Sequence, residues 1–248
     1  MTHVIIIFFT ALVAVFLSSM SGGGMSAINV PVLLWLGYSF PVALVAQKVG
    51  SVFWTPISAY NYLKDRKIDW PFVILFGSAG LVGVYFGTLF ITTINQRILQ
   101  IIVGALILVL AIYTIFKKDF GLSEGKVYSK FRKCIAYIFA PVLGFYEGIF
   151  GAGNGILFPM LTLETHGFDF IDALGYYYIV SFSWVVFAAA LLIVKGYFSF
   201  TVVASTVAGS IIGGYFGSKY AKYKGNKFIK TMFVIIGTLL GLKLLIGI

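Results

Sequence analysis

Charged residues are scarce in this sequence. Only 10% of its 248 residues are Asp, Glu, Lys or Arg, while 60% are hydrophobic. Soluble domains usually carry about 25% charged residues, so the composition excludes a water-soluble protein and indicates an integral membrane protein. A transmembrane β-barrel would show strands of about 10 residues with alternating hydrophobicity, and no such pattern occurs. We therefore predict an all-α polytopic membrane protein.

Cysteine and histidine are also scarce. The one cysteine, Cys134, excludes an internal disulfide and a cysteine-rich metal site, and the two histidines, His3 and His166, are too few for a histidine-based metal centre. We expect neither a metal nor another cofactor. Basic residues outnumber acidic ones by 18 to 8, but they lie in short loops between apolar segments, as charges that set membrane topology do. This placement argues against nucleic-acid binding.

Glycine is abundant, and it gathers at two places inside apolar stretches. Residues Gly148–Pro159 contain four glycines, an asparagine and a proline, and Gly22–Pro31 contain an earlier copy of the pattern. Glycine weakens a helix interior by about 1 kcal/mol and proline by about 3 kcal/mol relative to alanine. A regular helix therefore ends at each of these two segments, which we call the first and second breaks.

The two breaks belong to a longer internal repeat. At an offset of about 130 residues, Lys64–Trp70 matches Val194–Phe200, and Gly83–Gly87 matches Gly213–Gly217. Small residues spaced three or four apart allow membrane helices to cross closely. We assign this scaffolding role to the glycines of the matched helices: Gly80, Gly83, Gly87, Gly209, Gly213 and Gly217.

The apolar stretches after the breaks, Ile28–Leu36 and Ile156–Leu163, are too short to cross a hydrocarbon core of about 30 Å alone. They fit the returning halves of re-entrant hairpins. We predict two repeats, residues 1–118 and 134–248, joined by a cytoplasmic linker over residues 119–133. Each repeat has one broken hairpin and three transmembrane helices, which gives about eight membrane segments by hydropathy.

The basic loops Lys64–Lys67, Lys117–Lys133 and Lys219–Lys227 are placed in the cytoplasm by the positive-inside rule. For the third loop to lie inside, the segment Cys134–Leu163 must return to the side from which it started, which supports a hairpin over a single broken crossing. Each half then has three crossings and one hairpin, an odd number of crossings. The repeats are then inverted, and both termini face outward. Val4–Leu17 lacks a basic region before it, so we expect a retained membrane segment and not a signal peptide. The protein is expected in the cell membrane as a multi-pass protein.

The paired glycine-rich breaks, each closed by a proline, resemble the TauE/SafE family of sulfite and organosulfonate exporters. Gly144–Gly151 is similar to the start of that family's second motif, and Ala46–Val49 to the element after its first break. Gly213–Gly217 and Lys224–Lys227 resemble its closing region. The first motif departs from the family's pattern at Met25-Ser26-Ala27. Gln47 is a second departure, because asparagine is more usual at that position. The resemblance covers the whole chain and implies export of small oxyanions driven by an ion gradient.

A break inside a membrane leaves backbone N–H groups without helical partners, and the half-helix after it points a partial positive charge at the gap. An oxyanion suits that arrangement. The alternative is that the glycines of the breaks only let helices pack closely, and that Tyr178 is a packing residue. The predicted substrate-binding residues are Gly22, Gly23, Gly24, Ser26, Asn29, Gln47, Lys48, Gly151, Gly153, Asn154, Gly155 and Tyr178.

Lys48 and Glu147 are the two ionisable residues that lie deepest in apolar segments. A charge at such depth costs at least about 2.5–3.5 kcal/mol on insertion scales, and it usually has a partner and a function. Lys48 could bind the anion, pair with a carboxylate or extend to the membrane interface. Glu147 could carry a coupling proton, neutralise Lys48 or brace the second hairpin.

We predict a secondary transporter that exports a small oxyanion by alternating access coupled to an ion gradient. The alternatives are a passive anion channel and an intramembrane enzyme. An enzyme is disfavoured because the sequence has no P-loop, no Gly-x-Ser-x-Gly element and no cluster of metal ligands. The expected partners are a small anionic substrate and the lipid bilayer, and the sequence leaves homo-oligomer formation open.

Overall fold

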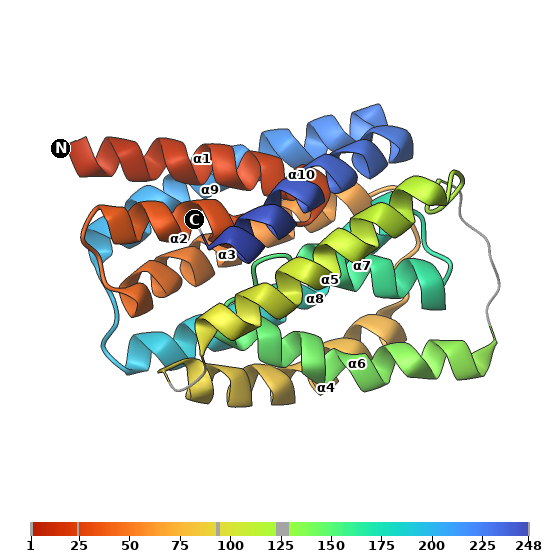
Figure 1. The fold of residues 1–248 in the computed structure, drawn as a ribbon, viewed down its shortest axis with the longest axis horizontal. Helices are drawn as coiled ribbons and strands as arrows, with labels where there is room; N and C mark the ends of the chain where they lie inside the picture. The colour runs from red at the N-terminus through yellow and green to blue at the C-terminus, as the bar shows by residue number, and fades with distance from the viewer. Residues whose placement is uncertain (1, 24, 93–94, 123–128, 248) are drawn as a thin grey trace.

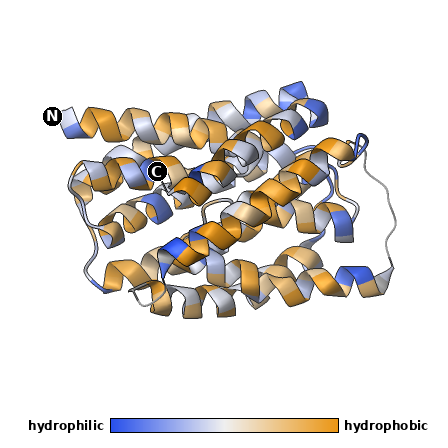
Figure 2. Ribbon diagram, in the orientation of Figure 1, coloured by the Kyte–Doolittle hydropathy of each residue, from blue (hydrophilic) through white to orange (hydrophobic). Residues whose placement is uncertain are grey.

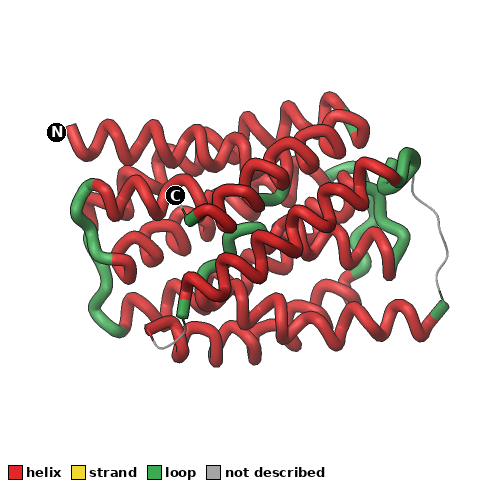
Figure 3. The backbone as a smooth tube through the Cα atoms, in the orientation of Figure 1, coloured by secondary structure: helices red, strands yellow, loops and turns green. Residues whose placement is uncertain are grey.

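Helices make up all the regular secondary structure of the part of the chain that the computed structural model describes, residues 2–23, 25–92, 95–122 and 129–247 (Figures 1 and 3). The predicted all-α fold is confirmed. The helices are α1 (Thr2–Ser21), α2 (Met25–Trp35), α3 (Phe40–Leu63), α4 (Trp70–Leu89), the 3-10 turn η1 (Phe90–Thr92), α5 (Gln96–Phe116), α6 (Lys130–Ile149), α7 (Asn154–Thr165), α8 (Phe170–Val194), α9 (Phe200–Lys224) and α10 (Asn226–Ile246).

Helix length separates spanning helices from shorter ones. Within the described residues, α1, α4, α5, α8, α9 and α10 are long and apolar enough to cross a membrane. α3 has 24 residues but carries more polar side chains, among them Gln47 and Lys48. α2 and α7 have 11 and 12 residues, so at 1.5 Å per residue they reach only about 16 and 18 Å. The chain is therefore a polytopic helical membrane protein.

Each glycine-rich break forms the turn of a helical hairpin. α1 and α2 form the first hairpin, which begins and ends at the left end of the molecule in Figure 1. α6 and α7 form the second hairpin, which begins and ends at the right end. Gly22 and Gly153 have φ of +81° and +84°, a region that glycine enters without steric cost. The sequence placed the breaks correctly because the signal for them is local.

The helices of the two halves pack in matched pairs. α1 lies against α9 as α6 lies against α4, while α3 pairs with α8 and α5 with α10. The scaffolding role of the glycines is confirmed by contacts to the opposing backbone: a Cβ at Gly83 would lie 1.9 Å from the Pro141 oxygen, and one at Gly213 would lie 2.4 Å from the Leu12 oxygen. Each of these pairs joins a helix of one half to a helix of the other half, as expected of a duplicated unit. The repeat boundaries and the inversion of the halves in the membrane stay predictions.

The basic segments meet at one end of the molecule. Lys222 pairs with Asp65 at 2.7 Å, and Asn226 Nδ2 donates to the Leu122 carbonyl at 3.2 Å. The Lys222 hydrogen bond holds the pKa of the Asp65 carboxyl below its usual value. Figure 2 shows hydrophilic residues at this end and an apolar band along the helices. The shared end agrees with the predicted topology, whereas the side of the membrane that it faces stays a prediction.

Two predicted segment boundaries need correction. The basic segment Lys219–Lys227 is mostly helical, because α9 continues to Lys224 and ends at Gly225. α6 begins at Lys130, inside the predicted linker. Lysine and arginine are good helix formers, so charge alone does not mark a loop. Residues 123–128 of the linker lie outside the described part of the chain.

A matched pair of glycine substitutions tests the helix packing. Gly83→Ala should destabilise the protein by about 1–3 kcal/mol, because the methyl group meets the α6 backbone. Gly237→Ala should change stability by less than about 1 kcal/mol, because its nearest neighbour would lie 3.5 Å away. Thermal unfolding in detergent compares the two. Equal tolerance of both substitutions would contradict the close α4–α6 contact.

Single-cysteine labelling tests the topology. In a Cys134→Ser background, Lys67→Cys and Lys224→Cys should react with an impermeant thiol reagent from the same side of the membrane. Lys195→Cys, in the turn between α8 and α9, should react from the opposite side. All three native side chains are exposed. Labelling of positions 67 and 224 from opposite sides would contradict the arrangement of the hairpins.

Candidate functional site

The turns of the two hairpins touch each other near the middle of the molecule. A Cβ at Gly22 would lie 1.8 Å from the Gly155 oxygen, and a Cβ at Gly155 would lie 1.6 Å from the Gly22 oxygen. Only glycine allows backbones this close. The two breaks, which are more than a hundred residues apart in sequence, therefore form one structural unit at the centre of the fold.

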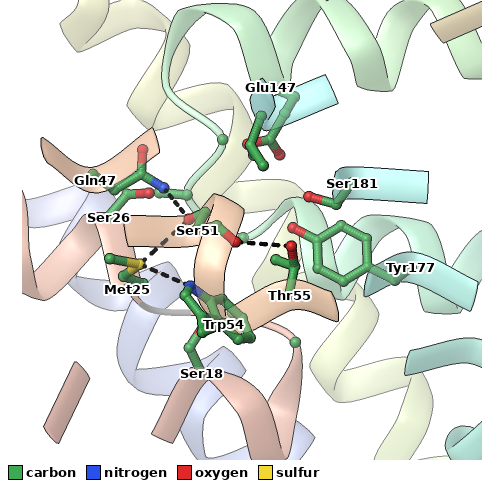
Figure 4. Close-up of a pocket in the computed structure, with 16 residues that line it drawn as sticks. Ser18, Met25, Ser26, Gln47, Ser51, Trp54, Thr55, Glu147, Tyr177 and Ser181 are labelled. Atoms are coloured by element: carbon green, nitrogen blue, oxygen red, sulfur yellow. Dashed lines mark hydrogen bonds between the residues drawn. The ribbon is translucent and has the colours of Figure 1, made fainter. Parts of the chain in front are cut away.

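A small polar cavity of about 20 Å³ lies at this contact (Figure 4). It is bordered by the start of the first break, the beginning of α2, the middle of α3 and α8, and the second break. A volume of this size holds about one water molecule, so a larger ligand requires the hairpins to separate. The lining residues are Ser18, Gly22, Gly23, Met25, Ser26, Gln47, Ser51, Trp54, Thr55, Glu147, Gly151, Ala152, Gly153, Tyr177, Ser181 and Val185.

Two serines from equivalent helices face the cavity, and sequence reasoning missed both. Ser51 lies on α3 and Ser181 on α8, and each precedes a tryptophan by three positions, Trp54 and Trp184. The Ser-x-x-Trp pairs are 130 residues apart, the offset of the internal repeat, so the repeat itself could have identified them. Trp54 Nε1 donates to Met25 Sδ at 3.3 Å, which fixes the start of α2 beside the cavity.

Lys48 and Glu147 form an ion pair between the two halves. Lys48 Nζ lies 2.6 Å from Glu147 Oε1 and also donates to the Glu147 backbone carbonyl. Their relative exposures are 0% and 2%, so Lys48 does not extend to the interface. The pair lies at the carbonyl end of α6, where a cation is favourable. The pairing of Lys48 with a carboxylate, one of its three predicted roles, is the one that the structure shows.

The other carboxylate oxygen of Glu147 is also bound. Asn154 Nδ2 donates to Glu147 Oε2 at 2.9 Å and to the Leu143 carbonyl at 3.2 Å. Gly151 has φ of +74°, and a Cβ there would lie 2.6 Å from Glu147 Oε1, so glycine makes room for the carboxylate. Glu147 thus ties α3, α6 and α7 together, a geometry that favours its bracing role.

Tyr178 holds the end of α1 much as Lys48 holds the end of α6. Its hydroxyl donates to the Ser18 carbonyl at 3.0 Å, and the Tyr62 hydroxyl donates to the Ser19 carbonyl at 2.8 Å. The Ser18 carbonyl also accepts from the Gly22 N–H at 2.7 Å. The Ser19 carbonyl belongs to the last carbonyls of α1, which have no intrahelical partner, so the buried Tyr62 hydroxyl satisfies it. Tyr178 itself does not line the cavity, although Ser18, whose carbonyl it binds, does.

The predicted site residues fall into two groups. Seven line the cavity: Gly22, Gly23, Ser26, Gln47, Gly151, Gly153 and the predicted coupling residue Glu147. Asn29, Lys48, Asn154, Gly155 and Tyr178 lie around it without lining it, while Gly24 lies outside the described residues. Met25 begins α2 and Gly153 is the N-cap of α7, so both half-helix N-termini border the cavity.

Comparison with known proteins points to one family. The family model for sulfite exporter TauE/SafE matches residues 7–244. A "Probable membrane transporter protein" of Haemophilus influenzae is 27% identical and covers 96% of this chain and 93% of its own length. "Probable membrane transporter protein ORF9" of a Sinorhizobium species is 26% identical, over 96% of this chain and 91% of its own. "Probable membrane transporter protein YfcA" of Escherichia coli K12 is 23% identical, over 97% of this chain and 88% of its own length. No solved structure matches the chain.

The ion pair can be tested by removing one charge or both. Lys48→Met alone should destabilise the protein by about 3–5 kcal/mol, because Glu147 is left buried without a partner. Lys48→Met combined with Glu147→Gln should recover much of that loss, because no unpaired charge remains. Thermal unfolding of both single variants and the double variant forms a double-mutant cycle. Additive effects would show that the two residues do not interact.

Proposed function

The chain belongs to the sulfite exporter TauE/SafE family, and we propose that it exports a small oxyanion, such as sulfite or an organosulfonate, by alternating access coupled to an ion gradient. Membership in this family makes it a membrane transporter. The proposal concerns the substrate, the mechanism and the energy source.

The observation that carries the proposal is the convergence of two half-helix N-termini on one polar cavity. Each N-terminus presents backbone N–H groups and about half a unit of positive charge. Anions bind at such termini in many proteins. The hydroxyls of Ser26, Ser51 and Ser181 add donors from both halves of the chain, which suits a ligand with several equivalent oxygens.

The charge balance of the site supports an anion of low charge. Lys48 is neutralised by Glu147 in this conformation, so the anion is held by N–H and O–H groups and not by a free ammonium. A direct contact between Lys48 and the anion, as the sequence predicts, requires Glu147 to release the lysine. Glu147 is also the one charged residue among those that line the cavity, so protonation of its carboxylate would effect that release.

The hairpins provide a physical basis for alternating access. They come from opposite ends of the molecule and meet tip to tip. The cavity between them holds only about one water molecule, so it represents a closed state. Withdrawal of one hairpin tip would open the cavity to one end, and withdrawal of the other would open it to the opposite end. Broken helices at the centre of repeated halves are a recurrent plan of secondary transporters.

Two serines of α8 provide a matched test of the substrate site. Ser181→Ala should lower the rate of sulfite transport in proteoliposomes about tenfold or more, because a hydrogen bond to a charged group contributes about 1.5–3 kcal/mol. Ser183→Ala, whose hydroxyl donates to the Val180 carbonyl of its own helix, should transport normally. Equal rates for both variants would contradict the proposed site, and no transport of sulfite, sulfate or sulfonates by the native protein would overturn the proposed substrate class.

A further inference from the structure

A second buried polar cluster lies beside the cavity. Seven buried side-chain nitrogen and oxygen atoms have no hydrogen-bond partner within the described residues, and five of them belong to Asn29, Gln47, Thr206 and Ser210. Relative exposure is 0% for Asn29, Thr206 and Ser210 and 4% for Gln47. A buried polar group without a partner costs about 1–3 kcal/mol, so a concentration of them indicates a missing ligand. We call these four residues the polar cluster.

Three helices bring the polar cluster together around Gly50. A Cβ at Gly50 would lie 3.0 Å from Ser210 Oγ, 3.0 Å from Thr206 Cγ2 and 3.1 Å from Met25 Cε. Gly50 thus lets α3 lie close to Met25 of α2 and to Thr206 and Ser210 of α9. Asn29 follows Met25 by one helical turn, and Gln47 precedes Gly50 by nearly one turn, so helix periodicity places both on the faces that meet here.

The chemistry of the polar cluster suits a hard monovalent cation. Its four side chains offer four oxygens with free lone pairs: Asn29 Oδ1, Gln47 Oε1, Thr206 Oγ1 and Ser210 Oγ. Hard cations prefer oxygen ligands, and coupling ions in transporters are often held by neutral oxygens near broken helices. The polar cluster contains no carboxylate. Dehydration of a divalent ion is far more costly, so neutral ligands favour a single positive charge.

The polar cluster also lies where a positive charge is needed. Lys48 is occupied by Glu147, so no free full charge compensates an anion in the cavity. Gln47 lines the cavity with its neighbours and donates from Nε2 to Ser51 Oγ at 3.4 Å, while its Oε1 is unpartnered. A cation held at Gln47 Oε1 would therefore lie one side chain away from the anion.

We propose that Asn29, Gln47, Thr206 and Ser210 form a sodium site whose ion compensates the charge of the oxyanion and couples its transport to a sodium gradient. The coupling role rests on the proposed function, whereas the binding of sodium does not. A functional role is thereby assigned to Thr206 and Ser210, which lie outside both breaks.

The repeat-related contact, where α4 packs against α8, carries no equivalent of Thr206 and Ser210 among the described residues. The positions 130 residues before Thr206 and Ser210 are Phe76 and Gly80. Phe76 packs against Phe158 and Trp184, with ring centroids 5.0 and 6.0 Å apart, and a Cβ at Gly80 would lie 2.1 Å from the Trp184 ring. The equivalent space is filled by aromatic side chains. The structure therefore supports one sodium ion per chain.

Thermal unfolding of the purified protein in detergent tests the site without any substrate. Sodium chloride should raise the melting temperature in proportion to the logarithm of its concentration above the dissociation constant, by about 5 to 10 °C at a hundred times that constant. Ionic strength is held constant with N-methylglucamine chloride, and potassium chloride serves as the second arm. An equal melting temperature in sodium and N-methylglucamine would overturn the proposal, and a shift with potassium but not with sodium would overturn the assignment to sodium.

Variants on α9 locate the site. Thr206→Val and Ser210→Ala should each reduce the sodium-dependent shift by half or more. Ser205→Ala is the matched control, because its hydroxyl donates to the Thr201 carbonyl of its own helix, and it should keep the full shift. An unchanged shift in both site variants would overturn the assignment. The sodium titration of the native protein stands even if a variant does not fold, and a sodium shift without oxyanion transport would contradict the proposed function alone.

Discussion

The contact between Gly22 and Gly155 is the constraint on which the rest of the structure depends. Two helical hairpins from opposite ends can meet in the membrane only if their turns approach backbone to backbone. Backbone groups freed by the breaks must find partners inside the protein, because lipid offers none. Tyr62 and Lys48 supply partners for carbonyls at the ends of α1 and α6. The central cavity is the space left where these requirements meet.

The candidate site is close to neutral, although we propose that it binds an anion. The Lys48–Glu147 pair joins the halves and contributes no net charge. Attraction for an oxyanion then comes from the two half-helix N-termini and, as we propose, from a bound cation. The two predicted repeats also differ here, since the side chains at Thr206 and Ser210 are polar whereas those around Phe76 are aromatic. The proposed cation site therefore lies on one side of the cavity.

The sequence predicts the fold well because its signals are local. Breaks and spans are each marked by a few adjacent residues, and the glycine rows on α4 and α9 repeat at one offset. Tertiary pairings are different. Lys48 and Glu147 were each identified by depth, yet their pairing across 99 residues could not be separated from other roles. The direction of Tyr178 depends on the rotation of α8, and a run of three tyrosines carries no information about it.

Counterflow in proteoliposomes tests the central claim most directly, because it separates a carrier with one central site from a passive pore. Vesicles loaded with unlabelled sulfite should take up labelled sulfite faster than empty vesicles do, since the bound anion returns the hairpins to the outward-facing state. This acceleration should be lost in Ser181→Ala. Equal uptake by loaded and empty vesicles would contradict the central claim, because a pore has no site that must be occupied before it changes orientation.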